Sequence, residues 1–200
     1  MFFASPRWEE VTYWSVDLET GGLDATSAAL LSVGMVPVRA GTIRLGEAFQ
    51  SLVRPRPEDD FSHDSMRAHQ LVPSDVNEAP ALEVVLREVD RRLEGGVLVV
   101  HQASLDVTFL RRAHAATGLR WPRPRVVDTV DLIVRASHRS HFIDPSPAPL
   151  EPLLNLAAAR RHYGLPDYGS HDALTDAVAT AELFLVLRRT LGARRLRELV

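Results

Sequence analysis

The sequence predicts an α/β protein in which a mixed sheet is flanked by helices, and three observations support this class. Strand-like runs come first in the chain, before any segment with helical spacing of apolar residues. Helical segments then alternate with two further strand-like runs, as in βα units. Apolar residues make up 46% of the 200 residues, which is enough for a sizeable core. We therefore expect a single domain over residues 1–200, with its core at about 10–190.

The first strands are expected close to the N-terminus. The stretch "VTYWSVDLE" at 11–19 alternates and is rich in β-branched and aromatic residues. Residues 29–55 hold two more strand-like runs, and "RAGT" between them places Gly41 at an expected hairpin turn. Later strands are expected at 97–102, a continuous apolar run typical of a buried strand, and in the short run that ends at Asp128.

The helical segments carry start or stop signals that help to define them. Gly96 and Gly118 are suitable stops, Asp128 or Thr129 is a suitable cap, and Ser170 is the expected cap of the last helix. The expected helices are 78–96, 103–118, the segment after 128, 153–166 and 170–192.

Composition excludes several classes of protein and site. With 23 basic and 26 acidic residues the net charge is −3, so bulk charge alone does not predict nucleic-acid binding. The absence of cysteine excludes disulfides and thiolate metal sites. We see no signal peptide and no run of ~18 uncharged apolar residues, and therefore expect a cytoplasmic protein without a membrane partner. The proline-rich stretch 141–152 is expected to be a loop, and the sequence does not indicate the role of its part 144–152.

Two carboxylates, Asp17 and Glu19, stand one residue apart at the C-terminal end of the first expected strand. Residues i and i+2 of a strand share a face and lie roughly 7 Å apart. Their repulsion would keep one of them protonated unless a cation lay between them. Mg²⁺ and Mn²⁺ suit such oxygen ligands. Because a bare D-x-E pattern is also common as a solvated pair, the interpretation depends on further acids.

Three later residues supply partners for this pair. Asp106 follows the strand-like run at 97–102 and stands among apolar neighbours, although a lone acid there is also typical of a helix start. His171 and Asp176 are five residues apart, about 140° around an ideal helix, so they do not share one face. This favours Asp176 as a fixed ligand and His171 as a general base, with Asp172 as a first-turn acid. Such a set favours two-metal hydrolysis of a phosphodiester.

The motifs that carry these residues resemble those of the DEDDh, or DnaQ-like, family of 3′→5′ exonucleases. This family includes the proofreading epsilon subunit of bacterial DNA polymerase III, ribonuclease T and oligoribonuclease. "DLETGG" at 17–22 resembles its first motif, "HQASLD" at 101–106 its second, and "HDALTDA" at 171–177 its third. The resemblance extends over nearly the whole chain.

The resemblance implies a ribonuclease-H-like fold with a mixed five-stranded sheet. It implies hydrolysis of single-stranded nucleic acid from a 3′ end to nucleoside 5′-monophosphates, with DNA favoured and RNA as the alternative. The implied ligands of two Mg²⁺ or Mn²⁺ ions are Asp17, Glu19, Asp106 and Asp176, with His171 as general base. The residues implied to bind the terminal nucleotide are Thr20, Gly21, Leu23, His101 and Gln102.

The chain departs from the family pattern at two positions that flank Asp106. Gln102 stands where the family usually has asparagine, and Leu105 where it usually has phenylalanine. The C-terminal "RRLRELV" is not a clamp-binding peptide, which favours a free-standing exonuclease and leaves a polymerase partner open. The oligomeric state is also open.

Two other functions compete with this interpretation. An HD-type phosphohydrolase is suggested by the pairs at 63–64 and 171–172, but it would leave Asp17 and Glu19 unexplained. An inactive nucleic-acid-binding module with the same fold is the second alternative. Basic candidates for contacts with a nucleic acid backbone, each of them alone more typical of a solvated helix face, are Arg67, Arg111, Arg112, Arg135 and Arg139. Tyr168 and Phe142, in expected loops, are candidates for stacking on bases.

Overall fold

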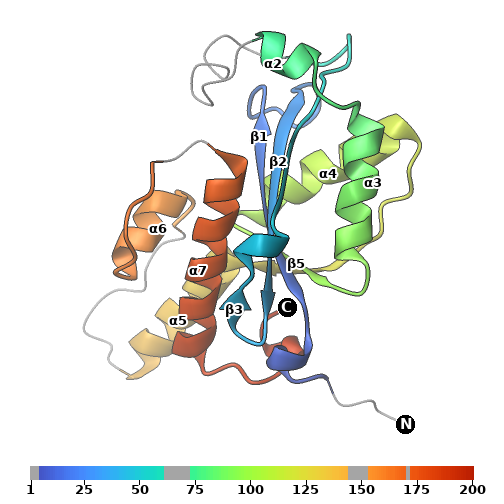
Figure 1. The fold of residues 1–200 in the computed structure, drawn as a ribbon. Helices are drawn as coiled ribbons and strands as arrows, with labels where there is room; N and C mark the ends of the chain where they lie inside the picture. Colours follow the sequence, from blue (N-terminus) through green and yellow to red (C-terminus); the bar gives the residue numbers. More distant parts are fainter. Residues whose placement is uncertain (1–4, 61–72, 144–152, 170–171) are drawn as a thin grey trace.

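The computed structural model describes residues 5–60, 73–143, 153–169 and 172–200. Figure 1 shows a central sheet with helices packed on both of its faces. The strand order is β3-β2-β1-β5-β6, and β4 also pairs with β2. The strands are β1 (Tyr13–Thr20), β2 (Leu30–Arg39), β3 (Thr42–Ile43), β4 (Phe49–Leu52), β5 (Val97–Val100) and β6 (Arg125–Asp128). The predicted α/β class with a mixed sheet flanked by helices is confirmed.

The six strands occupy five positions across the sheet. Strands β3 and β4 pair with different parts of β2, so they share one edge position. β1 and β2 are antiparallel, whereas β1–β5 and β5–β6 are parallel. The predicted hairpin turn is present, because Ala40 and Gly41 both take positive φ angles, 48° and 78°. A five-stranded expectation and a six-stranded observation therefore describe the same width of sheet.

The predicted helices are present with shifted ends. The first part of the expected proline-rich loop is helical, because residues 141–143 form the last turn of α5, and the rest of it, residues 144–152, lies outside the described residues. No helix among the described residues is long and apolar enough to cross a membrane. The helices are α2 (Pro73–Asn77), α3 (Leu82–Leu93), α4 (Ala103–Thr117), α5 (Thr129–Ile143), α6 (Leu156–His162) and α7 (Ala173–Leu191), with single 3₁₀ turns at Trp8–Glu10, Leu45–Glu47 and Leu196–Glu198.

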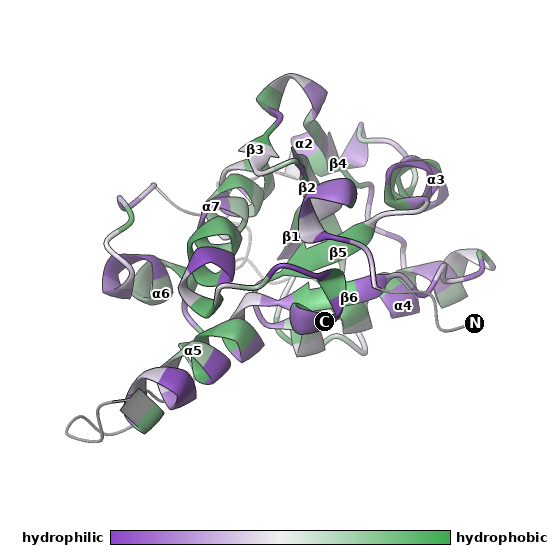
Figure 2. Cartoon of the chain, turned by 90° about the horizontal axis from the view of Figure 1, so that it is seen from below, coloured by the Kyte–Doolittle hydropathy of each residue, from purple (hydrophilic) through white to green (hydrophobic). Residues whose placement is uncertain are grey.

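Two apolar cores lie on the two faces of the sheet. Alternate side chains of β1, including Val16 and Leu18, belong to the core that α3 and α4 cover. Tyr13 points the other way and meets Phe184 of α7, with 4.9 Å between the ring centroids. Figure 2, seen from below, shows α3 and α4 on one side of the sheet and α5, α6 and α7 on the other. Strand β1 is therefore covered on both faces, and its C-terminal end approaches the start of α7.

Candidate active site

The C-terminal half of β1 carries Asp17 and Glu19. Strand β2 pairs with β1 along this half, where Asp17 lies opposite Gly34. On the other side, β5 pairs only with Tyr13–Ser15, because its chain then turns into α4. The two acids alternate with the apolar residues of β1 that pack beneath α3 and α4. Asp17 and Glu19 therefore face the layer that contains α7.

Gly34 allows α7 to begin directly on the sheet beside Asp17. A Cβ atom on Gly34 would overlap the backbone of Ala173 and Leu174, the first two residues of α7. Because the overlap is with backbone, no side-chain rotation would relieve it. Asp176 lies in the first turn of this helix, so the close packing at Gly34 brings Asp176 over the acids of β1.

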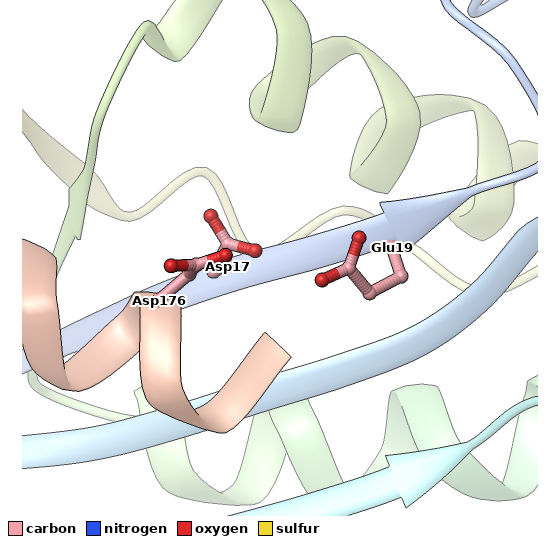
Figure 3. Close-up of side chains that lie close together, drawn as sticks. All are labelled: Asp17, Glu19 and Asp176. Atoms are coloured by element: carbon pink, nitrogen blue, oxygen red, sulfur yellow. The ribbon is translucent and has the colours of Figure 1, made fainter. Parts of the chain in front are cut away.

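Asp17, Glu19 and Asp176 form a carboxylate cluster. One oxygen of each acid lies within 4.8 Å of the oxygens of the other two. In Figure 3, Asp17 and Glu19 project from β1, and Asp176 projects from the start of α7. Glu19 is buried, with 6% of its surface exposed, and the other two are half-buried. Oxygens that bind one hard cation at about 2.0–2.6 Å lie up to about 4–5 Å apart, so this spacing fits a shared ion.

Asp106 lies in the first turn of α4, and Asp128 fixes the start of that helix. The Asp128 carboxylate, at the end of β6, accepts hydrogen bonds from the backbone N–H groups of Gln102 at 3.0 Å and Ala103 at 2.7 Å. It also accepts one from Val130 at 2.9 Å. A single carboxylate thus caps both α4 and α5, of which the sequence indicated only the second.

The acids at this site repel one another. Burial raises the pKa of Asp17 well above its usual value, and the charges of Asp106, Glu19 and Asp176 raise it further. Burial also raises the pKa of Asp106, and the charges of Asp128 and Glu19 add to this effect. Among the neighbouring charges, that of Asp106 raises the pKa of Asp17 most strongly, although Asp106 lies outside the three acids whose oxygens share the 4.8 Å spacing. A bound cation would relieve this repulsion, so the acids fit a divalent metal.

The start of α7 differs from the prediction. The cap is Asp172 rather than Ser170, because the Asp172 carboxylate accepts the backbone N–H of Thr175 at 3.0 Å. Gln50 of β4 donates a hydrogen bond to the same carboxylate, which ties the helix start to the edge of the sheet. Ser170 and His171 lie outside the described residues, so the role of His171 stays a prediction.

The last residue of β1 and the turn after it include three of the residues predicted to bind a nucleotide. The Thr20 hydroxyl donates to the carbonyl of Gly22 at 2.8 Å. The backbone N–H of Gly21 donates to the carbonyl of Ala29, also at 2.8 Å, so this N–H is used within the turn. Leu23 is 82% exposed beyond the turn and offers an apolar surface. Contacts of these residues with a nucleotide stay a prediction.

His101 and Gln102 lie at the junction of β5 and α4. Nδ1 of His101 lies 2.7 Å from Oγ1 of Thr129. Burial lowers the pKa of His101, although the charge of Asp128 opposes this effect. Gln102 takes the left-handed conformation with φ 73°, which is uncommon for residues other than glycine. The structure therefore fixes both residues close to Asp106, and their contact with a nucleotide stays a prediction.

Three of the arginines considered for contacts with a nucleic acid donate hydrogen bonds within the protein. Arg112 donates to Asp59 at 2.7 Å and to two backbone carbonyls of the segment that leads into β2. Arg135 and Arg139 donate to backbone carbonyls near the C-terminus. Arg67 lies outside the described residues. Because Arg112, Arg135 and Arg139 already bind other parts of the protein, they are weaker candidates for contacts with a nucleic acid.

The two candidate stacking residues differ in their surroundings. Tyr168 lines a hollow of about 150 Å³ that Asp176 also lines. Its hydroxyl donates to Glu182 at 2.8 Å, and the guanidinium of Arg160 lies 4.4 Å from its ring centroid. Phe142 is 89% exposed in the last turn of α5. Of the two, only Tyr168 lies beside the carboxylate cluster.

Known proteins with similar sequences point to one family. The family model described as exonuclease (RNase T) matches residues 15–184. The chain is 34% identical over 192 residues to a DNA polymerase III subunit epsilon-like protein of Rhodobacter capsulatus. It is 32% identical over 189 residues to a Mycobacterium tuberculosis protein named as a bifunctional exonuclease/endonuclease. The matches cover 94% and 92% of this chain but 25% and 27% of the relatives, so the chain spans about a quarter of their length.

Solved structures show the same fold at low sequence identity. Exonuclease I of E. coli in complex with a dA16 oligonucleotide superposes with a TM-score of 0.75 at 13% identity. The match covers 91% of this chain and 42% of that one. Cell-death related nuclease 4 gives a TM-score of 0.73 at 16% identity, covering 91% of this chain and 64% of that one.

The matched range bears on the choice between the alternative functions. It begins before Asp17 and ends after Asp176, so it includes every member of the carboxylate cluster. The HD-type alternative assigned no role to Asp17 and Glu19, which the structure brings together with Asp176. The chain belongs to the exonuclease family of DnaQ-like proteins with the ribonuclease-H-like fold.

Proposed function

We propose that this chain is a metal-dependent 3′→5′ exonuclease that hydrolyses single-stranded nucleic acid, preferentially DNA, to nucleoside 5′-monophosphates. The observation that carries the proposal is the carboxylate cluster, in which a strand and a helix hold three acids within 4.8 Å. Membership of the exonuclease family supports hydrolysis of phosphodiesters from a chain end. Single-stranded DNA is the ligand in a solved complex of E. coli Exonuclease I, which supports this class of substrate.

The four carboxylates are proposed to hold two Mg²⁺ or Mn²⁺ ions. When bound, such a pair would activate a water molecule and stabilise the leaving oxygen of the phosphodiester. The β ladder fixes Asp17 and Glu19, and the packing of α7 on Gly34 fixes Asp176, so the ligands need little reorganisation. The burial of Glu19 and Asp106 lowers the local dielectric and strengthens their interaction with a cation.

His171 is proposed as the general base that takes a proton from the attacking water. This role rests on the position of His171 in the third motif, five residues before Asp176. The exposed Leu23 is proposed to contact the terminal nucleotide, and Tyr168 to face a neighbouring base. A polymerase partner is an open part of the proposal, supported by the DNA polymerase III relatives alone.

The experiment uses 5′-labelled single strands of DNA and of RNA, incubated with Mg²⁺ or Mn²⁺. We expect a ladder that shortens from the 3′ end, faster for DNA than for RNA. Asp17→Asn is expected to lower the rate at least about 100-fold, because it removes a charged ligand. His171→Ala is expected to lower turnover by about 100-fold or more while metal binding persists.

Glu94→Gln is the matched control, because it removes an exposed carboxylate just after α3. It should degrade both strands at the wild-type rate. Shortening from the 5′ end, or an unchanged ladder with Asp17→Asn, would contradict the proposal. Absence of hydrolysis of either strand with intact metal binding would favour the inactive binding module. Loss of metal in His171→Ala would make His171 a ligand instead of a base.

A further inference from the structure

The first and last described segments of the chain meet at the end of the sheet opposite the carboxylate cluster (Figure 1). Arg7 and Arg195 face each other in an isolated antiparallel bridge. The backbone N–H of Trp8 donates to the carbonyl of Arg194 at 3.0 Å, which fixes the pairing. The fold therefore holds two arginines directly opposite each other, although they are 188 positions apart in the sequence.

These arginines line a hollow that we call the arginine pocket. Its volume is about 430 Å³, and its lining residues are Arg7, Glu9, Arg188, Arg194 and Arg195. Four arginines and one glutamate give the lining a charge of 4 − 1 = +3, whereas the whole chain carries −3. The lining of the pocket is therefore positively charged, although the chain as a whole is negatively charged.

Structural contacts use only part of the donor capacity of the arginines. Arg188 donates from Nε to a backbone carbonyl at 2.8 Å, and its guanidinium lies 4.1 Å from a ring centroid of Trp8. Arg195 donates to the carbonyl of Ser5 at 2.7 Å. The side chain of Arg194 makes no hydrogen bond or ion pair with the described residues. Each guanidinium has five N–H donors, so most of them remain for a ligand.

The nearby acids offset part of this positive charge. Glu9 lies 3.5 Å from Arg7 and offsets one charge. Glu198 accepts hydrogen bonds from the backbone N–H groups of Arg194 and Arg195, at 2.7 and 3.2 Å. These bonds and the charges of Arg197 and Arg195 lower the pKa of Glu198, so its carboxylate also offsets part of the positive charge. Like charges directly opposite each other destabilise a β pair. An anion bound between Arg7 and Arg195 would offset what remains of their repulsion after screening by water and salt.

We propose that the arginine pocket binds a phosphate group, carried either by a nucleic acid strand or by free phosphate. Guanidinium forks match phosphate oxygens with two parallel hydrogen bonds, and arginine is the side chain best suited to this recognition. The pocket volume falls in the range of about 300–1,000 Å³ that is usual for small ligands. The stacking of Arg188 on Trp8 holds one guanidinium in place for such a ligand.

A nucleic acid strand that contacts both the carboxylate cluster and the arginine pocket would have to be several nucleotides long. Arg188 follows Asp176 by 188 − 176 = 12 residues within α7, or about 18 Å along the helix axis. A stacked strand advances about 3.4 Å per nucleotide, so at least about five nucleotides are needed to connect the two sites. This version of the proposal rests on the proposed function, whereas binding of free phosphate does not.

The test measures binding without catalysis, in protein that carries Asp17→Asn and lacks divalent cations. The probes are inorganic phosphate, followed by calorimetry, and labelled single-stranded DNA of about 4 and about 20 nucleotides, followed by fluorescence anisotropy. The variant is Arg7→Gln with Arg194→Gln, both at exposed positions. The matched control is Arg87→Gln with Arg120→Gln, which removes the same charge from exposed positions elsewhere.

We expect the pocket variant to weaken binding of phosphate or of the long strand by about 10-fold relative to the control. For the long DNA strand, the loss of two phosphate contacts should reduce the slope of log binding constant against log salt concentration by about 1.4. Binding of the short DNA strand should not change. A loss for phosphate identifies a free ligand, and a loss confined to the long strand identifies the backbone. Equal binding of both probes by variant and control would overturn the proposal. Because no cleavage is measured, either result leaves the exonuclease proposal standing.

Discussion

Helix α7 links two groups of opposite charge that differ in burial. Asp176 in its first turn belongs to the carboxylate cluster, and Arg188 in its last turn lines the arginine pocket. The helix dipole favours this arrangement, because it stabilises an acid at the start and a base at the end. The two groups differ in access to water: Glu19 is 6% exposed, whereas the side chain of Arg7 is 67% exposed.

This difference in burial decides how strongly each group depends on a ligand. Buried acids are poorly screened, so the repulsion within the carboxylate cluster appears as the raised pKa of Asp17. The exposed arginines are screened by water and salt, so their repulsion is weak without any ligand. We therefore infer that the carboxylate cluster needs a cation to be charged, whereas the arginine pocket tolerates being empty and binds its anion in a salt-dependent way.

The largest effect is expected from Gly34→Ala, which acts on the carboxylate cluster alone. The added Cβ would overlap the backbone at the start of α7, so the helix start and Asp176 would have to move away from Asp17. A displacement of about 1 Å at a reacting centre can cost about 100-fold in rate. Overpacking should also lower the free energy of unfolding by about 1–3 kcal/mol. Hydrolysis rates and denaturant melts measure both effects.

The matched control for this substitution is Gly46→Ala, because a Cβ at Gly46 meets no atom within 4 Å. Its activity and stability should stay at the wild-type level. Phosphate binding at the arginine pocket should survive in both variants, which separates the two ends of α7. Full hydrolytic activity of Gly34→Ala would show that the position of Asp176 does not depend on this contact.

The second prediction concerns the cost of the buried charges in metal-free protein. Asp17→Asn keeps the side chain's shape and removes a group that must either carry a repelled charge or take up a proton on folding. We expect the unfolding free energy of the metal-free variant at neutral pH to exceed that of the wild type by about 1–3 kcal/mol. Divalent cations should then stabilise the wild type more than the variant. Replacing the exposed Arg194 by glutamine should give no comparable gain in unfolding free energy.

The pH dependence of this gain follows from the raised pKa of Asp17. The folded protein holds its proton more tightly than the unfolded chain, whose carboxyl has the usual pKa of 3.8. As the pH rises from about 4 through the raised pKa, Asp17 lowers the unfolding free energy of the wild type. The variant has no carboxyl group at this position, so its unfolding free energy does not show this decrease. Chemical denaturation between about pH 4 and pH 8, without metal, measures the difference. A difference that stays constant or shrinks with rising pH would contradict the prediction.

The sequence was sufficient where a feature depends on neighbours in the chain. Alternation along 11–19 placed Asp17 and Glu19 on one face of a strand, and the structure shows Val16 and Leu18 packed on the other. The start of the last helix was placed less well, because Ser170 and Asp172 are both good caps. The bond from Gln50, 122 positions away, supports Asp172, and no local pattern contains it.

The sequence was insufficient where two distant segments define a feature together. A glycine within a strand indicates only a weak point or a close approach, and it does not identify α7 as the element that approaches Gly34. Asp128 was expected to cap the helix that follows it, yet it also caps the helix that begins 25 residues earlier. No local pattern predicts the arginine pocket, because Arg7 and Arg195 become neighbours only when their two distant segments pair.

The smallest effect is expected from Gln102→Asn, which tests local strain at the carboxylate cluster. Gln102 has φ 73°, and asparagine enters this left-handed conformation more readily than glutamine does. Its backbone N–H would keep the bond to Asp128, which is 3.0 Å long in the wild type. We expect a gain of roughly 0.5 kcal/mol in unfolding free energy, a fraction of the cost of such strained conformations. Hydrolysis should change by less than about twofold, because Asp106 stays in place.

Gln102→Ala is the matched comparison, since it shortens the side chain without favouring the left-handed conformation. Denaturant melts of both variants should show the gain for asparagine only. A loss of stability in both would mean that the glutamine side chain packs at the start of α4 and that its contacts outweigh the strain. In that case the departure from asparagine at this position would be a structural adaptation of this chain, and the carboxylate cluster would depend on Gln102 as well as on Gly34 and Asp128.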